Sequence, residues 1–402
     1  PGASEQGAFG ADATPEAQAE GEETLRETIR RAFKRRIRAD VPVGAFLSGG
    51  VDSSMVCARL LEAGVSDLHT FTVVMPGQPG DESLQAREIA RRLGTSHHEI
   101  TLELGDSVDW LAQALDAMDV PSCDGPNTWL VSRAVASEGY KIACSGLGGD
   151  ELFYGYPSFR FARATGRVLP WLRPGRFAGR WVGQALQQLA AKPRWSRVWG
   201  ALEEGCDLPA LWLMRRGLFS AHEVKELAEF AARSDRLIAH ARAGCVRSDS
   251  ALRQTSALEL QLYMHDQLLR DTDAMSMAHA LEVRVPLIGK EVVEAVAALS
   301  PEWIWQGGAK WFLKRWLADD GLGGLFDGPK QGFALNWPDI WRRYLQAGPR
   351  REHVLLDART AAREHQGFLD GQRHWARSFV VEAAGRTVRG GVARPGRSDA
   401  LS

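Results

Sequence analysis

A turn rich in serine and glycine, Ser48-Gly49-Gly50-Val51-Asp52-Ser53-Ser54, follows a short apolar run and precedes a helix-like segment. Adjacent glycines let a backbone approach an anion closely, while serine hydroxyls and the free N–H groups of a helix's first turn point toward it. Asp52 adds a carboxylate, which beside a phosphate chain is suited to holding Mg²⁺. The turn therefore predicts a pyrophosphate site with a magnesium ion.

Two better-known glycine fingerprints are absent from this turn. It contains no G-x-x-x-x-G-K-[ST], and no G-x-G-x-x-G opens its helix, so a kinase, a GTPase or a dehydrogenase is not favoured. Taken alone, Ser-Gly-Gly is equally consistent with an ordinary strand-to-helix turn whose serines cap the helix. A second motif is needed to choose between a pyrophosphate site and an ordinary turn.

A second turn has the same pattern of small residues followed by acids: Ser145-Gly146-Leu147-Gly148-Gly149-Asp150-Glu151-Leu152-Phe153. We expect Asp150 to face Asp52 across the pyrophosphate. Two carboxylates sharing Mg²⁺ would offset the negative charge of a pyrophosphate group when it leaves. The pair of turns thus favours nucleotide chemistry over two unrelated loops.

A third segment, 271–287, is dense in charge although many of its residues are apolar. Buried acids and arginines need partners, so this is either a structural ion network or the wall of a pocket for a charged substrate. The sequence leaves both open. Our candidates for the substrate pocket are Glu151, Glu282 and Arg284.

The elements that must position these motifs alternate between apolar strands and amphipathic helices. We expect strands at Val41–Leu47, Leu68–Met75, His97–Leu102 and Lys141–Cys144, and helices at Glu23–Ile37, Glu82–Leu93 and Thr128–Glu138. This order predicts an α/β fold in which helices sandwich a parallel sheet, with both turns at the carboxyl ends of its strands. From about residue 201 the periodicity is helical, so the C-terminal half should be mainly α-helical.

The expected domain organisation is simple. We predict a flexible linker at residues 1–22 and a disordered tail at residues 386–402, because both segments lack apolar periodicity. Between them, 23–385 should form one domain with a nucleotide-binding part at about 38–160 and a helical part at about 161–385.

The overall composition argues against a nucleic-acid-binding or membrane protein. The 402 residues are 45% hydrophobic with a net charge of -1, which gives no overall attraction to nucleic acid or anionic membrane. No apolar run is long enough for a membrane span, and the five cysteines form no C-x-x-C pair. We therefore expect a cytoplasmic protein. An acid-free stretch between Glu151 and Glu203 carries arginines and tryptophans. We favour a peripheral helical segment over an RNA or membrane site, with docking to a partner domain as the intermediate alternative.

Four segments in order, 41–60, 140–160, 265–290 and Lys330-Gln331-Gly332-Phe333, resemble the synthetase domain of glutamine-dependent asparagine synthetases, a group of PP-loop ATP pyrophosphatases. The resemblance covers roughly residues 25–345. It implies a carbon–nitrogen ligase that adenylates a carboxylate with ATP, releases AMP and pyrophosphate, and joins ammonia to the acid as an amide. By default the acid is aspartate, the product is asparagine, and the nitrogen comes from glutamine.

The resemblance also implies roles for individual residues. Asp52 and Asp150 would hold the metal, and Lys330 would neutralise charge developing at the α-phosphate and carboxylate. The residues implied to bind ATP are Phe46, Leu47, Ser48, Gly49, Gly50, Asp52, Ser53, Val73, Ser145 and Gly146.

The chain departs from the family pattern in its second turn. Leu147 stands where aspartate-using members carry a glutamate and β-lactam-forming members a tyrosine, and Ala274 stands near the place of the glutamate that pairs with that tyrosine. A leucine cannot transfer protons, so the acceptor acid is open.

The 402 residues contain no segment that resembles the family's glutaminase domain, which begins with a catalytic cysteine. We expect an upstream portion that was removed, a separate glutaminase subunit, or use of free ammonia or another amine, and the linker favours removal. Two other functions stay open. One is a lasso-type peptide cyclase or an amidotransferase for a natural-product or polysaccharide carboxylate; the other is a non-catalytic scaffold with a nucleotide fold.

Overall fold

A computed structural model gives the fold of the chain. It describes residues 14–74, 82–101, 107–166, 201, 204–205, 207–219, 223–224, 234–328, 335–347 and 358–392. Lys330, most of the arginine- and tryptophan-rich stretch and residues 393–402 lie outside the described residues. In the described part of the chain, no helix combines the length and the apolarity required to cross a membrane.

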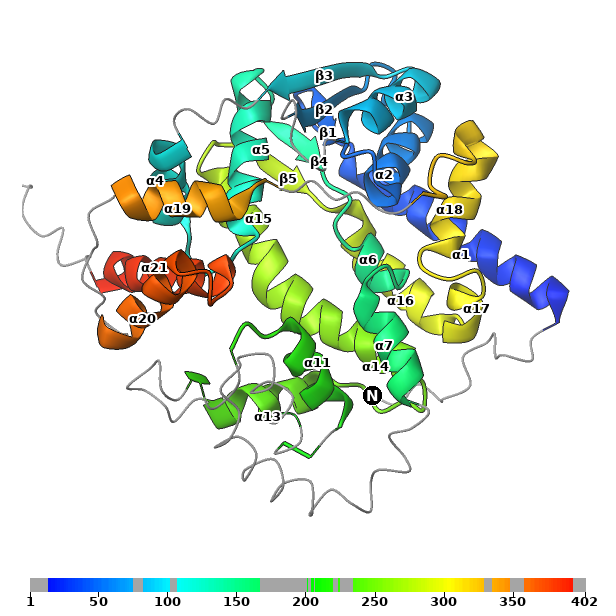
Figure 1. The fold of residues 1–402 in the computed structure, drawn as a ribbon. Helices are drawn as coiled ribbons and strands as arrows, with labels where there is room; N and C mark the ends of the chain where they lie inside the picture. Colours follow the sequence, from blue (N-terminus) through cyan, green and yellow to red (C-terminus); the bar gives the residue numbers. More distant parts are fainter. Residues whose placement is uncertain are drawn as a thin grey trace, which may run out of the picture.

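One parallel sheet of five strands forms the centre of the α/β part (Figure 1). Its strands are β1 (Val43–Phe46), β2 (His69–Val74), β3 (Ser96–Thr101), β4 (Ile142–Cys144) and β5 (Glu282–Arg284), in the spatial order β3-β2-β1-β4-β5. The parallel sheet sandwiched by helices is confirmed. Sequence patterns missed β5, whose three residues are too few to show an alternation.

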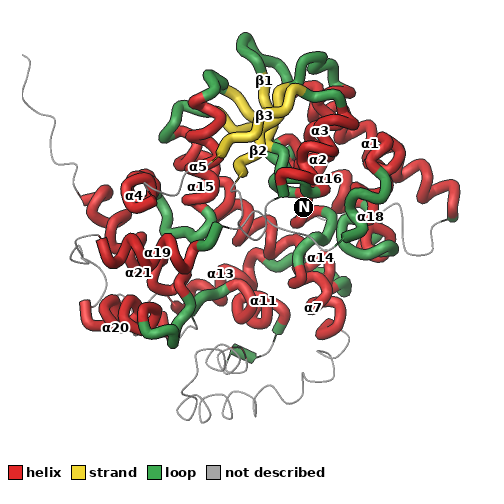
Figure 2. Tube along the Cα trace, turned by 45° about the horizontal axis from the view of Figure 1, so that its top comes forward, coloured by secondary structure: helices red, strands yellow, loops and turns green. Residues whose placement is uncertain are grey.

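Helices cover both faces of this sheet, and Figure 2 shows the strands enclosed by them. The helices that belong to the α/β part are α1 (Pro15–Arg36), α2 (Val51–Glu62), α3 (Ser83–Leu93), α4 (Ser107–Ala117), α5 (Gly125–Ser137), α6 (Gly149–Leu152) and α7 (Pro157–Gly166).

The C-terminal half is mainly helical in its described residues, as expected. Its helices are α11 (Leu208–Arg216), α13 (Ser234–Gly244), α14 (Ala251–Leu258), η4 (Glu259–Leu268), α15 (Leu269–Met277), η5 (Pro286–Ile288), α16 (Lys290–Ala298), α17 (Pro301–Trp305), α18 (Trp311–Leu317), η6 (Ala318–Leu322), α19 (Trp337–Ala347), α20 (Ala358–Leu369) and α21 (Trp375–Val392). The segment η4 is a π-helix, a form often found at functional sites.

Helices occupy part of each end for which we expected no regular structure. Helix α1 begins at Pro15, where Thr14 Oγ1 accepts a hydrogen bond from the Ala17 N–H, so residues 15–22 are helical rather than linker. Helix α21 continues to Val392, and Arg386 Nη1 lies 2.7 Å from the Asp116 carboxylate of the α4 helix. The expectation of a tail was wrong for 386–392, because a partner distant in sequence holds this arginine.

The alternation of side chains across the strands divides the core into two layers. Val43 and Ala45 of β1 belong to the large cluster with α1 and α2, whereas Phe46, with Phe71 of β2 and Val283 of β5, belongs to a small cluster on the other face. Helix α5 contributes Val135 to that second cluster. The face beneath α5 thus carries aromatic and branched apolar side chains toward the carboxyl ends of the strands.

A polar network joins the segment before α5 to η4 and α15. The Asp271 side chain, on α15, is 2% exposed and accepts a hydrogen bond from Ser122 Oγ. Gln267 Nε2 donates to Ser122 Oγ (3.2 Å) and to Asp124 Oδ2 (2.8 Å). Of the two readings left open for the third segment, the structural network is the one that Asp271 fits. Burial raises the pKa of Asp271 to about 7.

We predict that this carboxyl group makes the fold less stable as pH rises from about 5 to about 7. An aspartate in the unfolded chain has a pKa of about 3.9, so between these values the folded state binds more protons, and the free energy of unfolding falls by up to about 1.4 kcal/mol per pH unit. Asp271→Asn should remove that slope in urea denaturation at pH 5, 6 and 7. The matched control is Asp109→Asn, which changes an exposed acid on α4. Parallel profiles for wild type and Asp271→Asn would contradict the prediction.

Candidate active site between two glycine loops

The two glycine-rich turns lie side by side because their strands are neighbours. Strand β1 pairs with β4 in parallel, Ala45 opposite Cys144, and each strand leads directly into its turn. The strand order reverses between these two strands, and ligands of open α/β sheets bind at such a point. The expected convergence of both turns at one edge of the sheet is therefore confirmed.

The turns touch through their backbones. A Cβ atom placed on Gly146 would lie 2.8 Å from the carbonyl carbon of Asp52 and 2.8 Å from the amide nitrogen of Ser53. No side chain fits in that space, so glycine is required there. Gly49 adopts a φ of 77°, which glycine reaches without strain.

Serine hydroxyls fix the first turn against the start of α2. Ser53 Oγ donates to the Gly50 carbonyl (3.1 Å) and accepts from the Ser48 N–H (3.2 Å), while Ser54 Oγ also donates to Gly50 (2.7 Å). These bonds hold the turn in one shape at the positive end of the helix, where an anion is favoured.

Asp52 and Asp150 meet at one lysine. Lys310 Nζ donates to Asp52 Oδ2 and lies 2.6 Å from Asp150 Oδ1. The Lys310 side chain is buried, and burial alone would lower its pKa, but the charges of Asp52 and Asp150 raise it above its ordinary value. The two carboxylates, one from each turn, therefore converge on a single cation.

Lys310 is held in place from an uncommon backbone conformation. Its φ is 57°, in the left-handed region that residues other than glycine rarely adopt. Its N–H donates to the Phe153 carbonyl (2.8 Å), which follows the second turn, and α18 starts at the next residue. Such strain persists only where surrounding contacts over-determine it, as they do at many functional sites.

A cavity of about 340 Å³ opens beside the two turns. One part is apolar, with Phe46, Phe71, Val73 and Val283 from the sheet. A second part is formed by the turns themselves. The third part is polar and is lined by Asn127, Thr128, Glu151, Tyr156 and Thr272. The cavity can thus receive an apolar ring, an anion and a further polar group together.

Most of the residues that the sequence singled out reach this cavity. Those that line it are Phe46, Leu47, Ser48, Asp52, Ser53, Val73, Ser145, Gly146, Asp150 and Glu151. Gly49 and Gly50 shape the first turn without lining the cavity. Lys330 lies outside the described residues, so its role stays a prediction.

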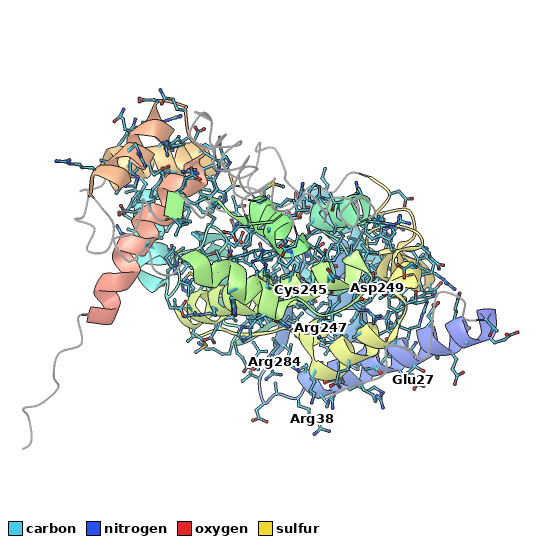
Figure 3. All side chains as sticks on the ribbon, turned by 90° about the horizontal axis from the view of Figure 1, so that it is seen from below. Glu27, Arg38, Cys245, Arg247, Asp249 and Arg284 are labelled. Atoms are coloured by element: carbon cyan, nitrogen blue, oxygen red, sulfur yellow. The ribbon has the colours of Figure 1, made fainter. Side chains whose placement is uncertain are left out.

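Glu282 and Arg284 are not brought to the cavity. Val283, between them, lines it, and alternation along β5 turns its two neighbours to the opposite face. There Arg284 pairs with Glu282 (2.8 Å) and donates to the carbonyls of Arg36 and Arg38; Figure 3 shows Arg284 close to Arg38. The prediction that Glu282 and Arg284 belong to the substrate pocket is therefore corrected: Arg284, paired with Glu282, binds the end of α1 to the sheet.

Sequence reasoning missed Lys310 and several polar residues of the cavity wall. Lys310 is 258 positions from Asp52, and only the preceding Gly307-Gly308 pair marks it as a turn residue near a helix start. The missed polar wall residues include Glu82, Asn127, Thr128, Tyr156 and Thr272. Asn127 Oδ1 is buried with no hydrogen-bond partner among the described residues, so it has room for a donor from a ligand.

Glu151 and Tyr156 form a hydrogen-bonded pair in the polar part. Tyr156 O–H donates to Glu151 Oε1 at 2.8 Å. Burial raises the pKa of Glu151 to about 7, and burial with the neighbouring acids raises the pKa of Tyr156 far above its usual range. The phenol thus stays a donor, and it fixes the direction of the Glu151 carboxyl group.

The residues present fit a magnesium ion bound together with a phosphate chain. Within the described ranges, no group of three His, Cys, Asp or Glu side chains is placed to hold a metal ion by itself. Mg²⁺, however, commonly takes only one or two carboxylates plus phosphate oxygens. Asp52 and Asp150 already converge on one cation, which is the arrangement such an ion needs.

We predict that Gly146→Ala separates the two turns. The added methyl group meets backbone atoms that cannot turn aside, so unfolding free energy should fall by about 1–3 kcal/mol and the cavity should lose affinity for ATP. Urea denaturation and titration with a fluorescent ATP analogue measure both effects. Gly328→Ala is the control, since a Cβ there has nothing within 4 Å. Unchanged ATP affinity in Gly146→Ala would contradict close contact between the turns.

The chain is similar in sequence to proteins of one known family. The family model for asparagine synthase matches residues 24–382. Asparagine synthetase [glutamine-hydrolyzing] 2 of Oryza sativa subsp. japonica is 36% identical over 151 residues, which cover 34% of this chain and 25% of the relative. Asparagine synthetase B [glutamine-hydrolyzing] of Escherichia coli (strain K12) is 34% identical over 155 residues, or 34% of this chain and 28% of the relative. The matched region thus spans about a quarter of each relative. With a family match over most of its length, the chain belongs to the asparagine synthase family.

Proposed function

We propose that the protein is an ATP-dependent amide synthase that adenylates a carboxylate, releases AMP and pyrophosphate, and joins nitrogen to the activated acid. The observation that carries the proposal is the convergence of Asp52 and Asp150, from two glycine turns, on one cation beside the cavity. Such an arrangement suits a reaction that separates pyrophosphate from the rest of ATP.

Each part of the cavity has a role in this reaction. The apolar part with Phe46, Phe71 and Val73 would receive adenine, and the turns with their serine hydroxyls would bind the β and γ phosphates. The polar part around Asn127 and Glu151 would then be left for the acid and the amine. With this division the α-phosphate would lie between the anion-binding turns and the acid, as transfer to the acid requires.

Asp52 and Asp150 would hold Mg²⁺ with the phosphate chain. When bound, the ion would supply positive charge that offsets the charge on the departing pyrophosphate. Lys310, which pairs with both acids, would then be available to phosphate oxygens. Lys330 would stabilise charge at the α-phosphate and carboxylate, as the family resemblance implies.

Aspartate is the proposed acceptor, with asparagine as product and glutamine-derived ammonia as the nitrogen source. The support is the family match and the printed names of the relatives, which are glutamine-hydrolysing asparagine synthetases. Leu147 lines the cavity and carries no group that transfers protons, so an acid other than aspartate is the alternative that this side chain favours.

The test is acid-dependent exchange of labelled pyrophosphate into ATP. We predict exchange with aspartate and Mg²⁺, and asparagine formation when ammonia is added. Asp52→Ala should lower both by at least about a thousandfold, because it removes a ligand of the Mg²⁺ that would offset the charge of the leaving group. A panel of other free acids and peptides runs in parallel and identifies the acceptor if aspartate is inactive.

Glu282→Gln is the matched control, because this acid lies on the face of β5 turned away from the cavity and is exposed. It should keep wild-type exchange. Exchange retained in Asp52→Ala, or no exchange in wild type with any acid of the panel, would overturn the proposed function.

A further inference from the structure

An arginine outside the cavity lies between two tyrosine rings. The guanidinium carbon of Arg216, the last residue of α11, is 4.3 Å from the ring centroid of Tyr156 and 3.9 Å from that of Tyr263. The two rings are themselves 5.9 Å apart in an edge-to-face arrangement. A planar cation over two aromatic faces attracts both, and more strongly where water is excluded.

Glu259 fixes the direction of this arginine. Arg216 Nε and Nη2 donate to Glu259 Oε2 at 3.0 and 2.7 Å, and the Glu259 side chain is fully buried. Ser158 Oγ donates to the other oxygen of the same carboxylate (2.7 Å). Because each of these groups has a fixed partner, the guanidinium plane cannot turn freely between the rings.

The hydroxyl group of each tyrosine is hydrogen-bonded to a residue in, or next to, the polar wall of the cavity. Tyr156 donates its O–H to Glu151, which lines the cavity. Tyr263, in the π-helical segment η4, donates to Asp124 Oδ2 at 2.9 Å. Asp124 precedes α5, which carries Asn127 and Thr128 into the same wall.

We infer that Arg216 is a positioning residue, which sets the place of Glu151 and Asn127 by holding Tyr156 and Tyr263. The inference rests on the proposed function insofar as this polar wall is the one that receives the acid and the amine. The turns and the apolar wall are not tied to Arg216 by these contacts. Its effect should therefore fall on the acid and leave ATP binding unaltered.

Arg216→Lys is the main variant, because lysine keeps a cation beside the buried Glu259 but loses the planar group that faces both rings. We expect KM for the acid to rise about tenfold or more, while the dissociation constant of ATP with Mg²⁺ stays within about twofold of wild type. The double variant Arg216→Met, Glu259→Gln removes both charges together, and should show the same pattern in a protein that leaves no buried charge unpaired.

Arg215→Met is the matched control. Arg215 is the neighbouring residue of the same helix and also lies over an aromatic ring, that of Phe161 at 4.9 Å, but phenylalanine has no hydroxyl with which to reach the cavity. This variant should retain the wild-type KM for the acid. A purely structural role of Arg216 would instead lower the unfolding temperature and leave KM unchanged.

A second readout does not depend on activity. The chain has five tyrosines, so 3-fluorotyrosine labelling gives few ¹⁹F resonances, and Tyr156→Phe and Tyr263→Phe assign two of them. Arg216→Lys and the double variant should shift both of those resonances and leave that of Tyr140 in place. If wild type activates no acid, the proposed function fails and the ¹⁹F comparison alone decides about Arg216. Unshifted resonances, or shifted ones with an unchanged KM for the acid, would overturn the inference.

Discussion

The ion pairs between Lys310, Asp52 and Asp150 are the interaction on which the site depends. Two carboxylates from separate turns would repel each other in a largely buried place, and the ammonium group of Lys310 offsets that repulsion. Removing one partner of such a buried group typically costs about 3–5 kcal/mol, because the remaining charges are left uncompensated. The same convergence of acids that requires the lysine also makes the place suitable for a divalent cation.

The topology of the sheet makes this convergence possible. Because β1 and β4 are adjacent and parallel, the turns that follow them leave the sheet at the same edge, and Gly146 lets their backbones touch. Lys310 reaches them from the start of α18, a helix whose apolar residues belong to the same large core cluster as those of α1 and α2. The helical half therefore completes a site whose anion-binding part lies in the α/β half.

Motifs of local sequence predicted much of this arrangement. The turns after β1 and β4 were recognisable because glycine, serine and aspartate stand directly after apolar strands, and the parallel sheet follows from alternating strands and helices. Lys310 was not recognisable, since its role depends on packing that joins residues 258 positions apart. Glu282 and Arg284 were misplaced for the opposite reason: their charge suggested a pocket, but the alternation along a three-residue strand was invisible in the sequence. The contact between Tyr156 and Arg216 was likewise not predictable, because it joins segments that are far apart in the sequence.

The central claim is that Asp52 and Asp150 together mark the cation and pyrophosphate end of the cavity. The most direct measurement is anomalous diffraction from crystals grown with Mn²⁺ and α,β-methylene-ATP, which cannot release pyrophosphate. The account predicts a manganese peak between the two carboxylates, with the outer phosphates on the Ser48–Ser53 turn and adenine against Phe46 and Phe71. A nucleotide bound elsewhere, or manganese away from both acids while Lys310 still joins them, would contradict it.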